Sequence, residues 1–313
     1  MQQAPVSAVL TVFNKADVLE SVLDRLRTDG GPLLREVVAV DDGSTDASRA
    51  LLAGYAAGWP ALRILHDGEN RGPSARLNEG AAAARGEWLL LLDADGILRR
   101  GAFAGMYRLA CAHALDALHA RVKRVADLQA GEALGPFPVD PGLEVSERPL
   151  ATLLERRGRV RMAWLVHRDC FQRAGGADPG IFVQDESLPL RLAGAARRIG
   201  LCEAAAVCEP KARFNLSADR RQQHHDRFLA HFRYLSAHPD LPASLRRGLI
   251  DRCLASAGRA TESGLLPEQS GLPLRLRRLL LRLGLGLDTA EYLAKLASQL
   301  TQQPGIRRPE VSV

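Results

Sequence analysis

The first hundred residues alternate between short apolar runs and segments with helical spacing, and this alternation restricts the fold more than any other feature. The apolar runs are nearly continuous, so they predict strands that are buried on both faces. Four strands are expected, at Val6–Phe13, Glu36–Val40, Leu62–Leu65 and Glu87–Leu92. Buried strands separated by helices indicate an α/β fold with a mostly parallel central sheet that is flanked by helices.

Between these strands, apolar residues recur three or four positions apart until glycine or proline ends the pattern, which predicts helices. They are expected at Lys15–Asp29, from an N-cap at Ser44 or Thr45 to about Ala57, and at Arg71–Ala84. Further helices are predicted at Ala102–Leu118, Arg168–Ala174 and Gln184–Ile199, further strands at Arg121–Leu128, Arg161–His167 and Leu201–Val207, and a loop from Gly135 to Pro149.

Beyond Lys211 the pattern becomes wholly helical. Helices are expected near Ala218–Ala237, Pro242–Ser263, Leu272–Leu285 and Asp288–Gln302. We therefore predict an α/β domain at 1–210 and a C-terminal helical region at 211–313.

Acidic residues follow two of the predicted strands at the point where each strand ends. Asp41 and Asp42 follow the second strand, and Asp93 and Asp95 follow the fourth. The carboxyl ends of parallel strands share one sheet edge, where open α/β sheets bind ligands. Two carboxylate clusters at one edge repel each other unless a cation or a ligand offsets them. Carboxylates beside substrate phosphates suit Mg²⁺ or Mn²⁺, so Asp93-Ala94-Asp95 indicates a divalent metal site.

Several other phosphate-binding and catalytic patterns are missing from the sequence. There is no Walker motif and no G-x-G-x-x-G after the first strand, which weighs against P-loop and dinucleotide-binding enzymes. Ser44 and Ser74 lack a Gly-x-Ser-x-Gly context, which weighs against a serine hydrolase.

Four segments resemble the nucleotide-binding half of the family 2 inverting glycosyltransferases, which have the glycosyltransferase A-type fold. They are Thr11–Lys15, Val40–Asp46, Asn70–Gly80 and Leu92–Asp95. Each segment alone is a weak signal, but their order and spacing together are specific. Downstream, Gly175–Asp178 followed by Phe182–Leu192 resembles the acceptor-side helix of that family, so the resemblance covers roughly residues 5–210.

This resemblance implies a role for each matching residue. The expected nucleotide-sugar-binding residues are Thr11, Phe13, Asn14, Asp41, Asp42, Arg71, Gly72, Asn78, Asp93, Ala94 and Asp95, of which Asp95 and Asp93 are the metal ligands. An Asp41 or Asp42 carboxylate would accept a hydrogen bond from the base. Arg71 and Gly72 would lie near the base and diphosphate, and Asn78 would steady that wall.

Asp185 is the expected catalytic base. An inverting transfer needs one carboxylate within hydrogen-bond reach of the attacking hydroxyl, and a metal can stabilise the diphosphate leaving group without a protein acid. Asp185 lies in the first turn of a predicted helix, where the helix dipole favours a carboxylate. The alternative is that Gln184-Asp185-Glu186 only begins the helix, and Glu186 is the second candidate for the base.

The sequence departs from the family pattern around the metal. Gly96 stands where many relatives have a further acid, which makes substrate and water more important as metal ligands. Many relatives also carry a histidine after the last strand, whereas Lys211–Ser217 contains none. Arg213 or Asn215 is expected to help hold the diphosphate instead.

Charge is distributed unevenly along the chain. Residues 211–313 carry 17 Lys and Arg against 9 Asp and Glu, a balance of +8 within a net charge of +6. These arginines belong either to solvated helices or to a surface for an anionic partner. Leu272–Leu287 either packs on the body or a second subunit, or lies on a membrane surface. His224 and His225 are expected on a surface helix.

Cysteine usage and hydropathy indicate a cytoplasmic protein. The five cysteines form no CxxC pair and are expected as thiols in a reducing compartment. No signal peptide is expected at the start, and no apolar stretch reaches the roughly 18 residues of a membrane span. Peripheral contact at the inner face of the membrane stays open.

Together these features predict an inverting, metal-dependent glycosyltransferase that uses a nucleotide-sugar donor, UDP-linked by preference, and a saccharide or lipid-linked acceptor in surface polysaccharide or lipopolysaccharide assembly. One alternative is a sugar nucleotidyltransferase, although Thr11–Asn14 offers no Gly-rich, Lys- or Arg-bearing loop. Another is a non-catalytic sugar-nucleotide-binding protein. A homo-oligomer is left open, and nucleic acid is not expected as a partner because no aromatic residues interleave with the arginines.

Overall fold

The computed structural model of the 313-residue chain describes residues 4–156, 160, 162–210, 219–267, 272–284 and 289–308. Its strands are β1 (Val6–Val12), β2 (Leu34–Asp41), β3 (Leu62–His66), β4 (Trp88–Asp93), β5 (Ile97–Leu98), β6 (Ala117–Val125), β7 (Leu143–Ser146), β8 (Trp164–His167) and β9 (Ile199–Pro210). Its helices are α1 (Leu19–Gly30), the 3₁₀ turn η1 (Gly31–Leu33), α2 (Ser48–Gly58), α3 (Pro73–Ala83), α4 (Ala102–Ala112), α5 (Leu128–Glu132), α6 (Pro149–Glu155), α7 (Arg168–Ala174), α8 (Gln184–Ala195), α9 (Arg220–Ala237), α10 (Ala243–Glu262), α11 (Leu274–Arg282) and α12 (Ala290–Thr301).

The strands form one sheet in the order β3-β2-β1-β4-β8-β6-β9-β5, with β7 also paired to β9. Strands β1 to β4 are parallel to their neighbours among themselves, whereas β8 runs antiparallel to both β4 and β6. The α/β fold class with a mostly parallel sheet is therefore confirmed. The antiparallel β8 was not foreseen, because strand direction depends on the connection between strands and not on the strand's own residues.

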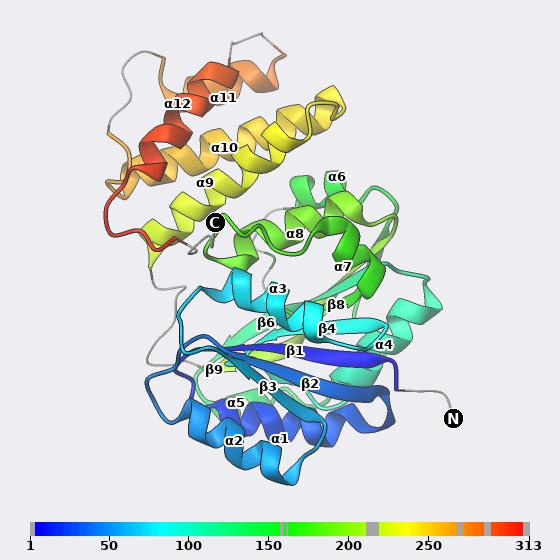
Figure 1. The fold of residues 1–313 in the computed structure, drawn as a ribbon. Helices are drawn as coiled ribbons and strands as arrows, with labels where there is room; N and C mark the ends of the chain where they lie inside the picture. The colour runs from blue at the N-terminus through cyan, green and yellow to red at the C-terminus, as the bar shows by residue number, and fades with distance from the viewer. Residues whose placement is uncertain are drawn as a thin grey trace.

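Helices cover both faces of the sheet (Figure 1), with α1 and α2 on one side and α3, α7 and α8 on the other. Alternate residues of β1 enter two different cores. Leu10 packs in the core with Leu23 of α1, and Val9 packs in the opposite core with Leu77 of α3. Because both faces are buried, the strand has no polar alternation, which explains the continuous apolar runs.

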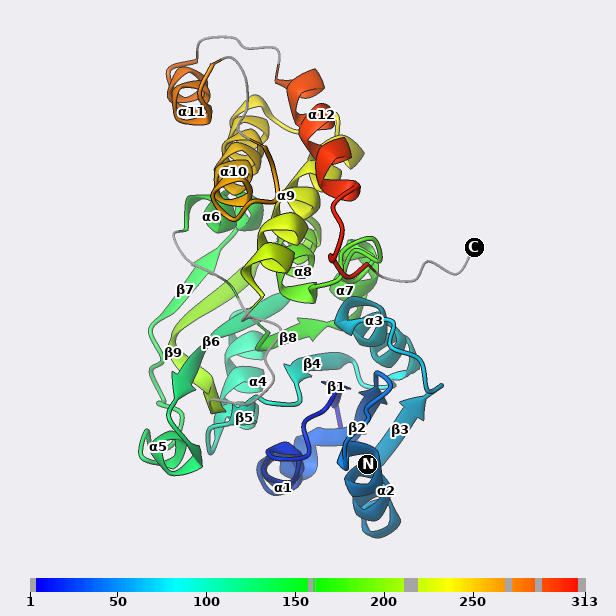
Figure 2. The same cartoon turned by 90° about the vertical axis from the view of Figure 1, so that its left-hand side faces the viewer.

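Helices α9 to α12 build a further core that contains Phe228, Leu254, Leu293 and Leu300. Figure 2 shows these helices beyond the sheet, with the chain after α12 returning toward α7 and α8. Strand β9 ends at Pro210, and residues 211–218 lie outside the described residues, so the boundary between 1–210 and 211–313 stays a prediction. In the part of the chain that the structure describes, no helix has the length and apolarity that a bilayer crossing requires.

Some predicted element bounds are wrong. The helix expected to start after Ser44 or Thr45 begins only at Ser48, and the helix expected over Ala102–Leu118 ends at Ala112. The expected loop from Gly135 to Pro149 contains β7, which pairs with β9. Pairing across the sheet explains two of these errors, because Ala117 and Leu118 pair with β8 and β9 and β7 pairs with β9.

Candidate active site

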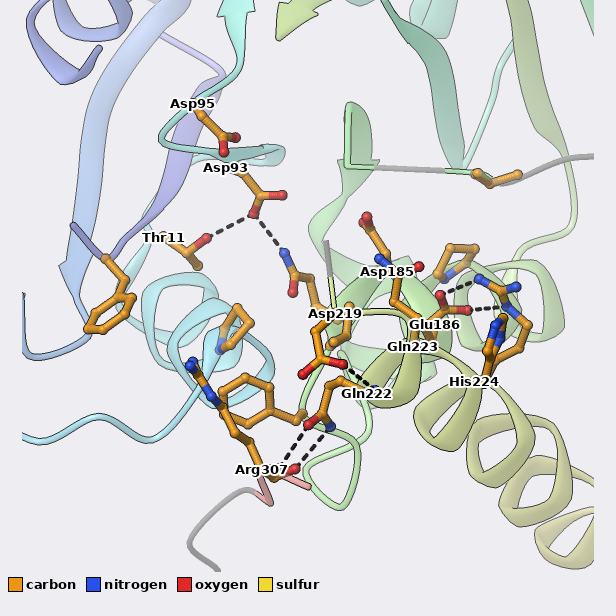
Figure 3. Close-up of a pocket in the computed structure, with 18 of the residues that line it drawn as sticks. Thr11, Asp93, Asp95, Asp185, Glu186, Asp219, Gln222, Gln223, His224 and Arg307 are labelled. Atoms are coloured by element: carbon orange, nitrogen blue, oxygen red, sulfur yellow. Dashed lines mark hydrogen bonds and ion pairs between the residues drawn. The ribbon is translucent and has the colours of Figure 1, made fainter. Parts of the chain in front are cut away.

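A cavity of about 670 Å³ lies where the strand ends of β1 and β4 meet helices α8, α9 and α10 and the chain near Arg307. We call its lining from the ends of β1 and β4 the sheet side (Thr11–Lys15 and Asp93–Asp95) and its lining from α9 and α10 the helix side (Gln222–His224, Arg227, His231, Arg252 and Arg259). Residues far apart in the sequence therefore share one pocket (Figure 3).

Asp93 is held by two neutral side chains on the sheet side. Thr11 and Asp93 are register partners in the parallel strands β1 and β4. The Thr11 hydroxyl donates to Asp93 Oδ1 at 3.0 Å and Gln184 Nε2 donates to the same oxygen at 2.7 Å (Figure 3). Burial and the nearby charge of Asp95 raise the pKa of Asp93 to about 7. An added positive charge at this position would stabilise the ionised form.

Asp95 has a cationic partner that the sequence did not point out. Lys15 Nζ lies 2.6 Å from Asp95 Oδ2, and both side chains are largely buried. Ala94 also lines the cavity, and its amide donates to the Thr11 carbonyl at 3.1 Å, which fixes the turn that carries both carboxylates. The pair Asp93 and Asp95 therefore lies in the pocket as predicted, next to a lysine.

Asp41 and Asp42 have different surroundings. Asp42 accepts from the amides of Arg71 at 2.7 Å and Gly72 at 3.1 Å and from Arg76 Nε at 3.0 Å, so it anchors the loop before α3. Asp41 Oδ1 accepts from the Ser44 amide at 3.2 Å. Its buried Oδ2 has no hydrogen-bond partner among the described residues. Asp41 is therefore the acceptor with unused capacity.

Arg71 lies within a group of carboxylates and is not among the residues that line the cavity. Its guanidinium pairs with Asp67 and with Glu79. Arg76, which sequence reasoning missed, is fully buried and pairs with Asp42 and Glu79 as well as Asp67. A fully buried arginine carries no sequence signal of its own. The arrangement fixes the loop and does not direct Arg71 into the pocket.

Position 72 has to be glycine because the Phe182 ring approaches the backbone closely there. The φ of Gly72 is +85°, and a Cβ added there would lie 2.6 Å from the Phe182 ring. Phe182 lines the cavity, and its carbonyl accepts from Ser74 Oγ at 3.1 Å. The glycine therefore lets the segment before α8 close against the start of α3.

Asn14 and Asn78, both expected in the site, form hydrogen bonds that connect separate segments of the chain. Asn14, at φ +51°, accepts from the Thr45 amide at 2.8 Å through Oδ1, and it lines the cavity beside Phe13. Asn78 exchanges two hydrogen bonds of 2.9 Å with the backbone of Ala177, which holds α3 to the segment before α8. Asn78 itself does not line the cavity, so its expected role in a wall of the site stays a prediction.

The neighbouring acids Asp185 and Glu186 both line the cavity. Glu186 accepts from Arg227 at 2.7 and 2.5 Å in a two-pronged ion pair, which Figure 3 shows. Asp185 lines the same cavity from the first turn of α8. An ion-paired carboxylate is a weak base, which weighs against Glu186 as the second candidate for the base.

The expectation of a surface helix for His224 and His225 is wrong. His225 is buried and its Nδ1 lies 2.7 Å from Asp226 Oδ1, while Asp226 Oδ2 accepts from the Val183 amide at 2.8 Å. His224 lines the cavity instead. The polar sequence of α9 resembled a solvated face because its partners come from distant segments.

Arg307 reaches the cavity from beyond α12. Its amide donates to Gln222 Oε1 at 2.8 Å, and Gln222 Nε2 donates back to its carbonyl at 3.0 Å. The guanidinium lies 5.9 Å from the Phe182 ring centroid. No motif surrounds Arg307 in the sequence, so no signal could have identified it. Arg213 and Asn215, expected to help hold the diphosphate, lie outside the described residues.

The carboxylate pair fits a divalent cation as a partial ligand set. Within the described ranges, no group of three or more His, Cys, Asp or Glu side chains is arranged to hold a metal ion. Asp93 and Asp95 supply hard oxygen donors, and burial, followed by the charge of Asp95, raises the pKa of Asp93 to about 7. These features suit Mg²⁺ or Mn²⁺ when a diphosphate and water complete the coordination.

Comparisons with known proteins agree with this architecture. The structure is similar to Staphylococcus aureus TarS 1-349 in complex with UDP-GlcNAc (TM-score 0.66, 15% identity, 94% of this chain and 88% of that chain). It is also similar to the mannosyltransferase PcManGT of Pyrobaculum calidifontis in complex with GDP-Man and Mn²⁺ (TM-score 0.60, 18% identity, 96% and 86%). The fold is thus the glycosyltransferase A-type fold.

A family model described as glycosyl transferase family 2 matches residues 7–170, more than half of the chain. The protein therefore belongs to glycosyl transferase family 2, as the sequence motifs predicted. Curated relatives match only in part. The succinoglycan biosynthesis protein ExoO of Rhizobium meliloti is 38% identical over 94 residues, which are 30% of this chain and 26% of that protein. The dolichyl-phosphate beta-glucosyltransferase of Drosophila melanogaster is 35% identical over 99 residues, 29% of this chain and 30% of that protein.

Proposed function

We propose that the protein is an inverting, metal-dependent glycosyltransferase that uses a nucleotide-sugar donor and a saccharide or lipid-linked acceptor in surface polysaccharide or lipopolysaccharide assembly. One observation carries the proposal. The candidate base Asp185 and the carboxylates Asp93 and Asp95 line the same cavity, although about ninety residues separate them. ExoO is named for succinoglycan biosynthesis, and the fly relative is named for a dolichyl-phosphate acceptor, which supports this acceptor class.

Donor binding would involve the sheet side together with Asp41, which is buried at the end of β2 and is not itself among the residues that line the cavity. Asp41 Oδ2 would accept the ring N–H of uracil, a donor that adenine and cytosine lack. The UDP-GlcNAc bound to TarS supports a uridine-linked donor, although the GDP-Man bound to PcManGT leaves guanine as the second choice. Asp95 and Asp93 would hold Mg²⁺ or Mn²⁺, which when bound neutralises charge on the diphosphate leaving group.

In the transfer reaction, Asp185 would act as the general base. Its carboxylate would take the proton of the acceptor hydroxyl as that oxygen bonds to the anomeric carbon from the face opposite the diphosphate. The bond from the anomeric carbon to the diphosphate oxygen breaks, and the nucleoside diphosphate leaves. Orientation of both substrates in one enclosed pocket supplies a large part of the rate.

A thermal-shift panel tests the donor class. Nucleotides and nucleotide sugars are added with and without Mn²⁺, and we expect a metal-dependent rise in melting temperature with uridine nucleotides. No shift with any nucleotide would count against the whole proposal. A sugar nucleotidyltransferase would instead form a nucleotide sugar from a sugar phosphate, and a binding protein would bind without turnover.

Helix α11 supports peripheral contact with a membrane as part of the proposal. Leu276, Leu279 and Leu283 are 40%, 51% and 64% exposed, and of its residues only Leu281 is buried. Arg278 and Arg282 pair with Asp251 of α10, so one face packs on α10 while the leucines are exposed. Exposed leucines next to arginines suit an anionic lipid surface.

A further inference from the structure

The helix side of the cavity carries more positive charge than its own carboxylates neutralise. Arg227 belongs to α9, and Arg252 and Arg259 belong to α10. Arg227 is compensated by the ion pair with Glu186. The two arginines of α10 differ from it, because neither forms an ion pair with a carboxylate among the described residues.

Arg252 is held in place by backbone carbonyls. Its Nη2 donates to the carbonyls of Leu154 and Arg156, each at 2.6 Å, at the C-terminal end of α6. Carbonyl oxygens orient a guanidinium but leave its charge uncompensated. The adjacent Asp251 turns away to α11, where it accepts from Arg278 at 2.9 and 3.0 Å. Arg252 is therefore a fixed, half-buried cation in the wall of the pocket.

Arg259 lies seven residues further along α10, a spacing that returns to the same face of a helix. It also lines the cavity and is exposed. Its side chain has no hydrogen bond or ion pair with any residue that the structure describes. The spacing lets both guanidinium groups approach one ligand in the cavity, with Arg252 fixed and Arg259 free to adjust.

The surroundings repel further positive charge. Burial lowers the pKa of Arg252. The charge of Asp251 opposes this shift, and the charges of Arg259, Arg227 and Arg278 add to it. His231 adds no charge at neutral pH, because burial lowers its pKa to about 4 and its Nδ1 donates to the Arg227 carbonyl at 2.6 Å. An anion placed between the arginines would remove this repulsion.

We propose that Arg252 and Arg259 bind a phosphate monoester or diester carried by the acceptor. This inference rests on the proposed function, because it assigns the helix side of the same pocket to the second substrate. Two guanidinium groups offer forked N–H donors that match phosphate oxygens. Glu186 pairs with Arg227 on this side and directly follows Asp185, so an acceptor held by its phosphate would have its hydroxyl near the candidate base.

Calorimetric titration of inorganic phosphate into protein saturated with UDP and Mg²⁺ tests the site, because the nucleotide fills the sheet side first. The variants are Arg252→Gln and Arg259→Gln, and the matched control is Arg275→Gln, an exposed arginine of α11 that does not line the cavity. We expect each pocket variant to bind phosphate about tenfold more weakly. The control should bind like the wild type, and UDP affinity should be equal in all four proteins.

Two results would overturn the proposal: no phosphate binding to the UDP-loaded wild type, or equal phosphate affinity in all four proteins. If Arg252→Gln does not fold because α6 loses its bonds, the exposed Arg259→Gln decides the outcome. If no nucleotide binds, the proposed function fails, and phosphate titrated into nucleotide-free protein still tests this site separately.

The source of the phosphate is distinguished by two further ligands. Glycerol 1-phosphate represents a soluble phosphosugar acceptor, and a short-chain polyprenyl phosphate in detergent represents a lipid carrier. Binding of both that weakens in Arg259→Gln assigns the site to phosphate itself. Arginine-dependent binding of only the polyprenyl phosphate assigns it to a lipid-linked acceptor, and binding of neither contradicts the proposal.

Discussion

The two sides of the pocket are built in different ways. On the sheet side, Asp93 and Asp95 end a strand whose register with β1 fixes their position, and the segments that carry them lie within the family match at residues 7–170. On the helix side, Arg227, Arg252 and Arg259 come from helices outside that match. The sheet side is acidic with one lysine, and the helix side is basic.

This difference indicates a division of labour. In the proposed function, the strand ends would hold the nucleoside diphosphate and its metal, since the carboxyl edge of an open α/β sheet is where ligands bind. Packed helices can change their side chains without disturbing the sheet, so they suit the part of the reaction that varies between relatives. Asp185 begins α8, which packs on both α3 and α9, and therefore links the two sides.

Removal of the candidate base should have the largest effect. Asp185→Asn removes the proton acceptor but keeps the size of the side chain, so we expect kcat to fall by about 10³-fold with unchanged UDP affinity. Release of UDP and of product is measured with a turnover assay. Asp219→Asn is the matched control, because it also removes a pocket carboxylate while asparagine still caps α9. Full turnover by Asp185→Asn would disprove the base assignment.

The ion pairs of Arg76 and of Arg227 should contribute unequally to the stability of the protein. Arg76 is fully buried and pairs with three carboxylates, of which Asp67 and Glu79 also pair with Arg71. Arg76→Met therefore leaves the buried Asp42 without its ion pair and weakens the other two pairs, and it should lower the free energy of unfolding by about 3–5 kcal/mol. Arg227→Met leaves one carboxylate unpaired and should cost about 1–2 kcal/mol. Urea unfolding of both variants measures the difference, and equal losses would contradict the expectation that the ion pairs of Arg76 stabilise the fold more than the ion pair of Arg227.

The acidic side should also make metal binding depend on pH. Asp93 holds its proton up to about pH 7, so Mn²⁺ has to displace that proton and should bind about tenfold more weakly at pH 6 than at pH 8. Without metal, the folded state binds more protons than the unfolded chain above pH 4, so stability should fall as pH rises from 4 to 7. Asp93→Asn should remove both trends, and their persistence in that variant would assign them to another group.

A substitution at Arg307 tests whether the segment after α12 contributes to donor binding. The guanidinium of Arg307 lines the cavity above Phe182, so Arg307→Ala should weaken binding of UDP by several-fold to about tenfold, as loss of one charge-assisted contact does. Arg308→Ala is the matched control, because Arg308 bonds to the Thr301 carbonyl and does not line the cavity. Equal UDP affinity in the two variants would remove Arg307 from the site.

The smallest effect is expected at the outer face of α11. Serine at Leu276, Leu279 and Leu283 should reduce sedimentation with anionic vesicles a few-fold. Stability should change by less than about 0.5 kcal/mol per position, because these side chains are exposed. Val139→Ser is the control, since Val139 is 89% exposed on another part of the molecule. Unchanged vesicle binding would leave α11 as a packing element only.

Sequence reasoning succeeded where a short stretch determines its own structure. Helix α7 was predicted at Arg168–Ala174 and is observed there, because Gly175 in the left-handed conformation ends it. The positions of Asp93 and Asp95 after a buried strand were also predicted correctly. Reasoning failed where partners are distant, as for β7, which forms only because β9 lies beside it, and for His225, whose burial depends on packing around α9.

By itself, the sequence determined the α/β class, the family and the placement of acids at one sheet edge, because strand periodicity and short motifs are local properties of the chain. Tertiary structure alone decided which residues surround these acids. It placed Arg76 beside Asp42 and Arg227 beside Glu186, and it brought Asp185 to the same cavity as Asp93 and Asp95. The same packing brought Arg252, Arg259 and Arg307 to the cavity, since no local pattern encodes a contact between segments so far apart.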